Sequence, residues 1–322
     1  MKKLSLLVLL FGLALPVPQT AAQTYPTMPV RLIIPYPPGG PMDDVGRVVG
    51  QRLSEMWGQP VVVDNRSGAD GSIGTEFVIQ ARPDGYTLLL GNSGPISINP
   101  NLHKGSKHNP LKDLEPITML ITMPQVLLVN PNLPVHSIKE LVEFAGSRPP
   151  GTLNYASSGV GNIQHLAMEE LQAVAGIRMN HIPYRGTAPA YIDLLAGRVE
   201  LMFGNTVGSL NFITAGSVRP IAISSMRRLP LLPNVPTIAE SYPGFEVTSW
   251  VGLFAPKDVP QPIIHKIQTD AAKVMAMPDV QARFAAQGAE VVASTPEQLR
   301  DFTLKEEAIY ARIIQSTGLA PK

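Results

Sequence analysis

The chain has 322 residues, of which 44% are hydrophobic and 16% are charged. This length fits two domains better than one small module, and the apolar content argues against a disordered chain. With 26 basic and 25 acidic residues, the formal charge is +1, a balance that argues against nucleic acid as a partner. The sequence has no cysteine, which excludes disulfide bridges, thiolate metal sites and a cysteine nucleophile.

Residues 1–22 have the layout of a cleavable secretory signal peptide. Two lysines form a positive start, an apolar stretch runs from Leu4 to Leu15, and small residues precede Gln23. The apolar stretch is too short to span a bilayer comfortably. We therefore expect cleavage before Gln23 and a secreted or periplasmic mature protein; the alternative is an uncleaved membrane anchor.

The first part of the mature chain alternates short apolar runs with helical patterns. Strands are expected at Val30–Ile34, Val61–Val63 and Tyr86–Leu90, and helices over Val45–Leu53 and Thr75–Ala81. This alternation is typical of βαβ units on a parallel sheet. Because the strands are continuous apolar runs, we expect both faces of the sheet to be covered.

The same alternation begins again at Val126–Val129. The further expected strands are Leu153–Ala156, Met179–Ile182, Leu201–Phe203 and Arg219–Ser224, and the helices Ser137–Ala145, Ile163–Ala175 and Ala188–Ala196. An extended segment, Glu246–Ala255, then precedes three helices, Ile263–Met275, Pro278–Gln287 and Pro296–Ser316. Two βα units in series are thus followed only by helices at the C-terminal end, so we expect the chain to return to the first unit. Lobe I would then be discontinuous, residues 23–122 plus 246–322, and lobe II would be residues 123–245.

Three loops share one form, in which small residues join a strand to a helix: Pro37–Asp44, Ala156–Asn162 and Tyr184–Pro189. A helix N-terminus presents unpaired N–H groups and the positive end of the helix dipole, so it can hold an anion without a cationic side chain. In open α/β sheets such loops lie at the carboxyl ends of strands, where ligands bind. The loops therefore predict an anion site; the alternative is that each is only a helix start.

Signals for catalysis are weak. Ser157 or Ser158 with His165 would supply a nucleophile and a base, but no G-x-S-x-G elbow surrounds the serines, and His165 is expected on the following helix. Gln164 stands where a dinucleotide fingerprint needs its third glycine. The histidines lack metal-ligand spacing. We expect no enzyme, no cofactor and no metal, and keep a secreted α/β hydrolase as an alternative.

Nine segments, in order along the mature chain, carry a resemblance to a known family. They are Leu32–Gly40, Gly58–Arg66, Pro83–Leu89, Leu153–Ser157, Gln164–Ala167, Ile182–Gly186, Leu232–Thr237, Gly244–Glu246 and Trp250–Pro256. These segments resemble the Bug (Bordetella uptake gene) family, the extracytoplasmic solute receptors of tripartite tricarboxylate transporters. The resemblance implies an α/β fold of the two-lobed, type II-like periplasmic binding protein kind. Each lobe would be a mainly parallel sheet flanked by helices, with the ligand in the cleft between them.

The resemblance also implies a small organic acid as ligand, held by loops of both lobes. We predict first-lobe contacts from Tyr36, Pro38, Gly39 and Gly40, and second-lobe contacts from Ser157, Ser158, Gly159, Asn162, Gly186, Thr187 and Ala188. Weaker candidates are Asn92, Ser93, His165 and Asn205. Asp43 is expected to cap its helix rather than to contact the ligand, because a carboxylate would repel an anion.

Several departures from the family pattern bear on the ligand, and among them Pro41 and Met42 replace smaller or hydroxylated residues in the first loop. Ile163 stands where members often carry a hydroxyl side chain, and Gly204 where they often carry aspartate. We interpret this as loss of a partner for an ammonium group and gain of apolar surface, which favours an aliphatic or aromatic dicarboxylate without an amino group. The alternative is that the lost aspartate was a structural cap.

The resemblance implies an inner-membrane tripartite permease as partner, and we expect a monomer. A receptor that reports to a two-component sensor kinase is the alternative role.

Overall fold

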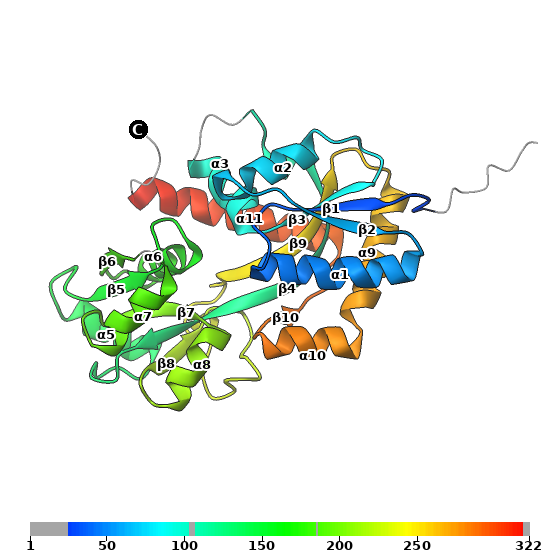
Figure 1. Cartoon of the computed structure of the whole chain (residues 1–322). Helices are drawn as coiled ribbons and strands as arrows, with labels where there is room; N and C mark the ends of the chain where they lie inside the picture. The colour runs from blue at the N-terminus through cyan, green and yellow to red at the C-terminus, as the bar shows by residue number, and fades with distance from the viewer. Residues whose placement is uncertain (1–24, 103–106, 185, 318–322) are drawn as a thin grey trace, which may run out of the picture.

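The longest strand among the described residues, β4 (Leu114–Val129), pairs with different neighbours along its length. Its first part runs antiparallel to β9 (Thr248–Pro256), and its last part runs antiparallel to β7 (Leu201–Asn205) and β8 (Arg219–Ile223). Figure 1 shows β4 extending from one half of the molecule into the other. The computed structural model describes residues 25–102, 107–184 and 186–317.

The first half of the sheet contains β1 (Val30–Ile34), β2 (Val61–Asn65) and β3 (Thr87–Gly91), which are parallel. Helices α1 (Pro41–Trp57) and α2 (Ser72–Ile79) connect them, and β9 then pairs antiparallel with β3. Alternate residues of β1 pack against residues spaced about one turn apart on α1; this buried set is Val30, Leu32, Ile34, Val45, Val49 and Leu53. The burial of one apolar face of α1 therefore fixes this helix on the sheet.

The second half contains β5 (Asn154–Ser157), which lies parallel to both β6 (Asn180–Pro183) and β7. Its helices are α5 (Ile138–Gly146), α6 (Ile163–Ala175), α7 (Thr187–Leu195) and α8 (Thr206–Thr214). The core beneath α6 is built from Leu127, Tyr155, Met168, Leu171 and Phe203, among others. Helix α6 ends at Gly176, whose left-handed conformation (φ 66°) suits a residue without a Cβ.

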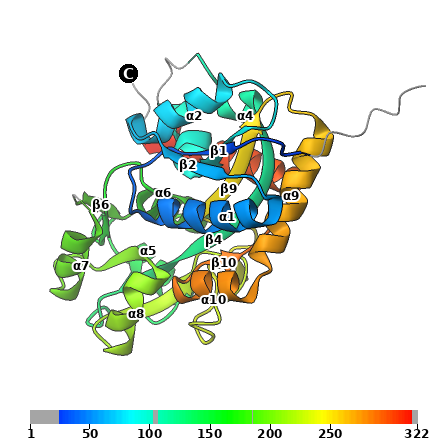
Figure 2. The same cartoon turned by 45° about the vertical axis from the view of Figure 1, so that its right-hand side comes forward.

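Helices of the C-terminal part return to the first half and reach the second. Figure 2 shows α9 (Gln261–Met275) and α10 (Pro278–Ala286) beside α1. After the short β10 (Glu290–Val291), α11 (Pro296–Thr317) packs on β4 and on α6. Its contact with α6 is apolar and buried, through Leu166, Tyr310, Ile313 and Ile314. One helix of the C-terminal part therefore contacts both halves of the molecule.

The short elements are η1 (Ala69–Gly71), the π-helical turn η2 (Gly94–Ile98), α3 (Asn99–Leu102), α4 (Pro110–Asp113) and η3 (Ile238–Glu240). Among the described helices, none combines the length and apolar character that a membrane span requires. The expected signal peptide, residues 1–22, lies outside the described residues.

The expected α/β class is confirmed, but the sheet is more mixed than the mainly parallel one that was expected. Parallel pairing holds within β1, β2 and β3 and within β5, β6 and β7. The chain leaves the first half along β4 and returns along β9, so these two strands lie antiparallel side by side. The lobe boundaries at residues 122 and 246 stay a prediction.

Candidate functional site

A cavity of about 690 Å³ is lined by residues from both halves of the molecule. We call it the central cavity, and its lining residues are Tyr36–Met42, Asp70, Asn92–Gly94, Ile98, Met123, Gly161–Ile163, Ser249 and Trp250. Its volume is in the range of small-molecule sites. Of these described lining residues, only Asp70 carries a charged side chain.

Helix α1 begins at the central cavity. Its N-cap residue, Gly40, is extended and supplies no side-chain cap, and Pro41 starts the first turn. Asp43 does not line the cavity: its Oδ2 accepts hydrogen bonds from the Gly39 N–H (2.9 Å) and from Arg47 Nε (2.8 Å). The Arg47 guanidinium, with further hydrogen bonds, lowers the pKa of Asp43 to about 2. The expected cap is not formed, because the Asp43 carboxylate accepts from Gly39, which precedes the helix, and from no N–H group of the first turn.

Helix α6 begins at the same cavity from the other half. Asn162 caps it, accepting a hydrogen bond from the His165 N–H (2.9 Å), and its Nδ2 donates to Ser158 Oγ (2.6 Å). Gly161 has a φ of 78° and donates its N–H to His165 Nδ1 (3.0 Å). The left-handed conformation at 161 suits glycine and brings the chain into the helix at the cavity edge.

The inner wall of the cavity depends on a close packing of Tyr36, Asn92 and Gly94. Tyr36 donates its hydroxyl proton to Asn92 Oδ1 (3.0 Å). A Cβ at position 94 would lie 2.9 Å from the Tyr36 hydroxyl oxygen, so only glycine fits there without a shift. Burial raises the pKa of Tyr36 to about 12, and the phenol therefore stays a neutral donor.

Seven predicted site residues line the central cavity: Tyr36, Pro38, Gly39, Gly40, Asn92, Ser93 and Asn162. Eight others do not: Ser157, Ser158, Gly159, His165, Gly186, Thr187, Ala188 and Asn205. Gly186 and Thr187 form the start of α7, and Asn205 caps α8 by accepting from the Gly208 N–H (2.6 Å). The first-lobe loop is therefore at the cavity, whereas most of the second-lobe set lies outside its lining.

The histidine that contacts Ser157 is not the one that the hydrolase alternative considers. Ser157 Oγ lies 2.7 Å from His181 Nε2, not from His165, and the Ser157 side chain is fully buried. The rings of His165 and His181 stack with centroids 3.9 Å apart, and burial lowers the pKa of both to about 4. Because a nucleophile needs access to its substrate, Ser157 is a packed structural side chain.

Ile163 and Gly204 differ in their relation to the cavity. Ile163 lines it and adds apolar surface. Gly204 lies on β7, where an added Cβ would collide with the hydroxyl groups of Tyr191 and Ser209. Those two groups share a hydrogen bond of 2.8 Å and fill the space of a side chain at 204. Gly204 itself does not line the central cavity.

Several lining residues were not anticipated from the sequence: Asp70, Ile98, Met123, Ser249 and Trp250. Asp70 has a φ of 48°, which is unusual for a residue with a side chain. The glycine-rich run Ser67–Gly74 was visible in the sequence, but nothing local indicates that its one aspartate reaches the cavity.

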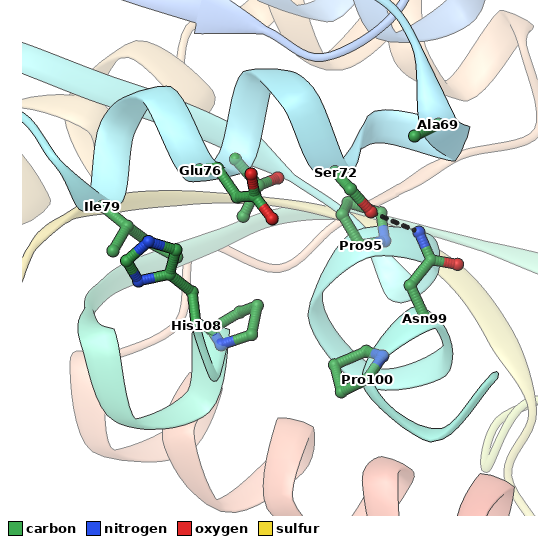
Figure 3. A pocket seen from close by; sticks show the side chains of 10 residues that line it. Ala69, Ser72, Glu76, Ile79, Pro95, Asn99, Pro100 and His108 are labelled. Atoms are coloured by element: carbon green, nitrogen blue, oxygen red, sulfur yellow. Dashed lines mark hydrogen bonds between the residues drawn. The ribbon is translucent and has the colours of Figure 1, made fainter. Parts of the chain in front are cut away.

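A smaller hollow of about 230 Å³ lies beside α2 in the first half. Figure 3 shows Glu76 and Pro100 on its walls and His108 at one end, with Asn99 Nδ2 donating to Ser72 Oγ (3.1 Å). None of the predicted site residues lines it. Across the described residues, no group of three histidine, aspartate or glutamate side chains is arranged to hold a metal ion.

The sequence matches the family model described as the tripartite tricarboxylate transporter family receptor over residues 45–319. This chain belongs to that family. BugT of Bordetella pertussis is 38% identical over 309 residues, which cover 95% of this chain and 94% of BugT. The resemblance to the Bug family is thereby confirmed. The family consists of periplasmic solute receptors and not of enzymes.

Two solved structures are similar to this chain over most of its length. A protein of R. palustris solved with adipate is 33% identical, covers 92% of this chain and 100% of its own, and has a TM-score of 0.71. A solute-binding protein from Polaromonas solved with no ligand is 27% identical, covers 91% of this chain and 100% of its own, and has a TM-score of 0.84. The two-lobed receptor fold is confirmed by these neighbours.

Proposed function

We propose that this protein is a periplasmic receptor that binds a small dicarboxylate without an amino group in the central cavity and delivers it to a tripartite permease. One observation carries the proposal: helices α1 and α6 both begin at a cavity whose described lining has no lysine, arginine or histidine. Helix N-termini from opposite sides would hold the two carboxylates of the ligand through main-chain N–H groups.

The apolar part of the lining favours an apolar middle in the ligand. Met42, Ile98, Met123, Ile163 and Trp250 would contact methylene groups or an aromatic ring. A carboxylate held by neutral donors leaves more readily than one paired with a buried cation. Reversible release is what a receptor that feeds a permease needs.

The lobe boundaries and the second-lobe contacts belong to the same proposal. The chain superposes better on the ligand-free Polaromonas protein than on the adipate complex, although its identity to the former is lower. This favours an arrangement in which lobe I (23–122 plus 246–322) and lobe II (123–245) stand further apart than in the ligand-bound state. On closure, Ser158, Gly159 and the start of α7 at Gly186–Ala188 would approach the ligand.

Asp70 supports a second candidate, a receptor for an amino dicarboxylate. Its carboxylate would attract an ammonium group and repel an anion. Because Asp70 is solvent-exposed, that attraction is screened, and the apolar lining favours the ligand without the amino group.

Export through the signal peptide, residues 1–22, would place the receptor in the periplasm as a monomer. A sensor kinase in place of the permease is the alternative partner. Mass spectrometry of periplasmic extract tests the export: the proposal expects a chain starting at Gln23, and a full-length chain in the membrane fraction would contradict it.

Calorimetric titration tests the ligand class with three compounds that share one carbon skeleton. Adipate carries two carboxylates, hexanoate lacks one of them, and 2-aminoadipate adds an amino group. The proposal expects adipate, or a dicarboxylate of another length, to bind at least about tenfold more tightly than the monocarboxylate and the amino dicarboxylate. Tightest binding of the amino compound would favour the second candidate, and no binding of any carboxylate would overturn both.

A further inference from the structure

A buried carboxyl group, Glu306 of α11, lies directly behind the inner wall of the central cavity. Ser93 Oγ donates to Glu306 Oε1 (2.8 Å), and Trp250 Nε1 lies 2.9 Å from Oε1 and 3.0 Å from Oε2. The Tyr310 hydroxyl donates to Oε1 as well (3.1 Å). Ser93 and Trp250 both line the cavity, so one carboxyl group holds two parts of its wall.

The protonation state of Glu306 decides what Ser93 can offer to the cavity. An ionised carboxylate only accepts hydrogen bonds, so Ser93 must turn its proton toward Glu306 and away from the ligand. A protonated carboxyl can donate from Oε1. Because an indole N–H cannot accept, that proton is directed to a hydroxyl group: Ser93 or Tyr310, which contact Oε1, or the buried Ser97, whose hydroxyl group also lies beside this carboxyl group. When Ser93 Oγ accepts it, the serine proton becomes free to point into the cavity.

We propose that Glu306 is a positioning residue that couples ligand binding to the uptake of one proton. An anionic ligand beside Ser93 needs a donor and disfavours a second negative charge behind the wall, so it favours the protonated carboxyl. The proton comes from solvent onto Oε1 when the ligand enters and returns to solvent when it leaves. This inference rests on the proposed function, because it requires a carboxylate in the central cavity.

The surroundings of Glu306 make it the group that titrates near neutral pH. Burial raises its pKa to about 7, against hydrogen bonds that lower it. The pKa of Tyr310 is raised well above its usual value, so this phenol stays protonated. Neither Ser93 nor Trp250 titrates in this range. The other charged or titratable groups nearby are Glu307 and Arg312 on α11, Glu170 on α6, and Asp70 and Tyr36 at the cavity.

Affinity measured between pH 6 and pH 9 tests the coupling, with adipate as the probe. The dissociation constant is expected to be constant below pH 6.5 and to rise by up to about tenfold per pH unit above pH 7, because one proton is taken up on binding. Glu306→Gln is expected to flatten this profile, since the amide donates to Ser93 at every pH. Glu307→Gln is the matched control on the same helix; Glu307 accepts from Asn101 (3.0 Å), and this variant should keep the wild-type slope.

The two tryptophans give a readout that needs no ligand. Trp250 donates its indole N–H to Glu306, and Trp57 donates to Asp270 Oδ2 (2.8 Å). The pKa of Asp270 is lowered, so its titration lies far from neutral. In ¹H–¹⁵N spectra we expect the Trp250 indole signal to shift with a midpoint near pH 7 and the Trp57 signal to stay in place.

The outcomes separate the two proposals. A flat affinity profile in wild type, a slope that survives in Glu306→Gln, or a Trp250 signal that does not titrate would each overturn the coupling while leaving the receptor function intact. If no dicarboxylate binds at any pH, the proposed function fails, and the coupling fails with it. If Glu306→Gln does not fold, the wild-type profile and the Trp250 titration still decide the matter.

Discussion

Arg312 Nη2 lies 2.5 Å from Glu170 Oε2, and this ion pair joins α11 to α6. The Glu170 side chain is 8% exposed and that of Arg312 is 58% exposed. Around the pair, Leu166, Tyr310 and Ile313 are buried. The pair therefore ties the C-terminal helix to the second half of the molecule, next to the buried carboxyl group behind the cavity.

Removal of this ion pair should destabilise the protein. Arg312→Ala leaves a mostly buried carboxylate without its partner. Because Arg312 is itself largely exposed, the pair is partly screened by solvent, and we expect a loss of roughly 1–2 kcal/mol in the free energy of unfolding. Urea denaturation measures it. Lys139→Ala is the control, because the Lys139–Glu143 pair is exposed on both sides and should contribute less than about 0.5 kcal/mol. Equal effects of the two variants would contradict this view of the α11–α6 contact.

Gly94→Ala should disturb the inner wall. The added methyl group would lie 2.9 Å from the Tyr36 hydroxyl and displace it from Asn92. We expect a loss of about 1–3 kcal/mol in stability and roughly tenfold weaker adipate binding. Gly146→Ala, where nothing lies within 4 Å of the new Cβ, should leave both unchanged. Unaltered binding in Gly94→Ala would mean that Tyr36 and Asn92 do not shape the site.

Asp70→Asn should change the preference for ligand charge. Removal of the one negative side chain in the described lining should strengthen adipate binding by roughly two- to fivefold at low salt and weaken binding of 2-aminoadipate. Asn tolerates the positive φ of 48° at this position. Asp258→Asn, which changes another aspartate at positive φ but away from the cavity, should leave both affinities as they are.

Glu306 should also make stability depend on pH. Its folded-state pKa of about 7 lies above the ordinary 4.5. The contribution of Glu306 to the free energy of unfolding is therefore fully present below pH 4.5 and is lost as pH rises through 7. Glu306→Gln does not ionise, and its stability relative to wild type should increase by roughly 2–3 kcal/mol between pH 4.5 and pH 8. Denaturation curves at several pH values measure this difference. A constant difference would contradict a titrating Glu306.

The buried histidines act in the opposite direction. Burial lowers the pKa of His165 and His181 to about 4, below the ordinary 6.5. Both histidines therefore bind a proton more tightly in the unfolded chain than in the folded protein. Wild type should therefore lose stability as pH falls from 6.5 toward 4. Comparison of Glu306→Gln with wild type at each pH cancels this effect, because both proteins contain the two histidines.

Local patterns in the sequence predicted elements whose cause is local. The strand Val30–Ile34 and the helix Ile163–Ala175 agree with the structure at both ends, because apolar periodicity and a capping asparagine define them. The first part of β4 was missed, since Pro116 and Pro124 interrupt its apolar run. Helix α8 was missed as well, because Gly208 and β-branched residues weaken its helical signal.

The site residues likewise differ in whether a local sequence pattern or long-range packing places them. The loop Tyr36–Gly40 was predicted because a strand, glycines and a helix start follow one another there. Glu306 lies 213 residues from the serine that it contacts. Trp250 lies on β9, which pairs antiparallel with β3 although the two strands are far apart in the sequence. Contacts of this kind arise from packing between distant segments, and no pattern within one segment indicates them.

Hydrogen exchange with and without adipate tests the central claim, that the ligand lies between the starts of α1 and α6. The account predicts slower exchange on adipate addition in peptides that cover residues 40–46 and 161–167, which contain the first turns of α1 and α6. Protection absent from both peptides, or confined to the hollow beside Glu76 and His108, would contradict it.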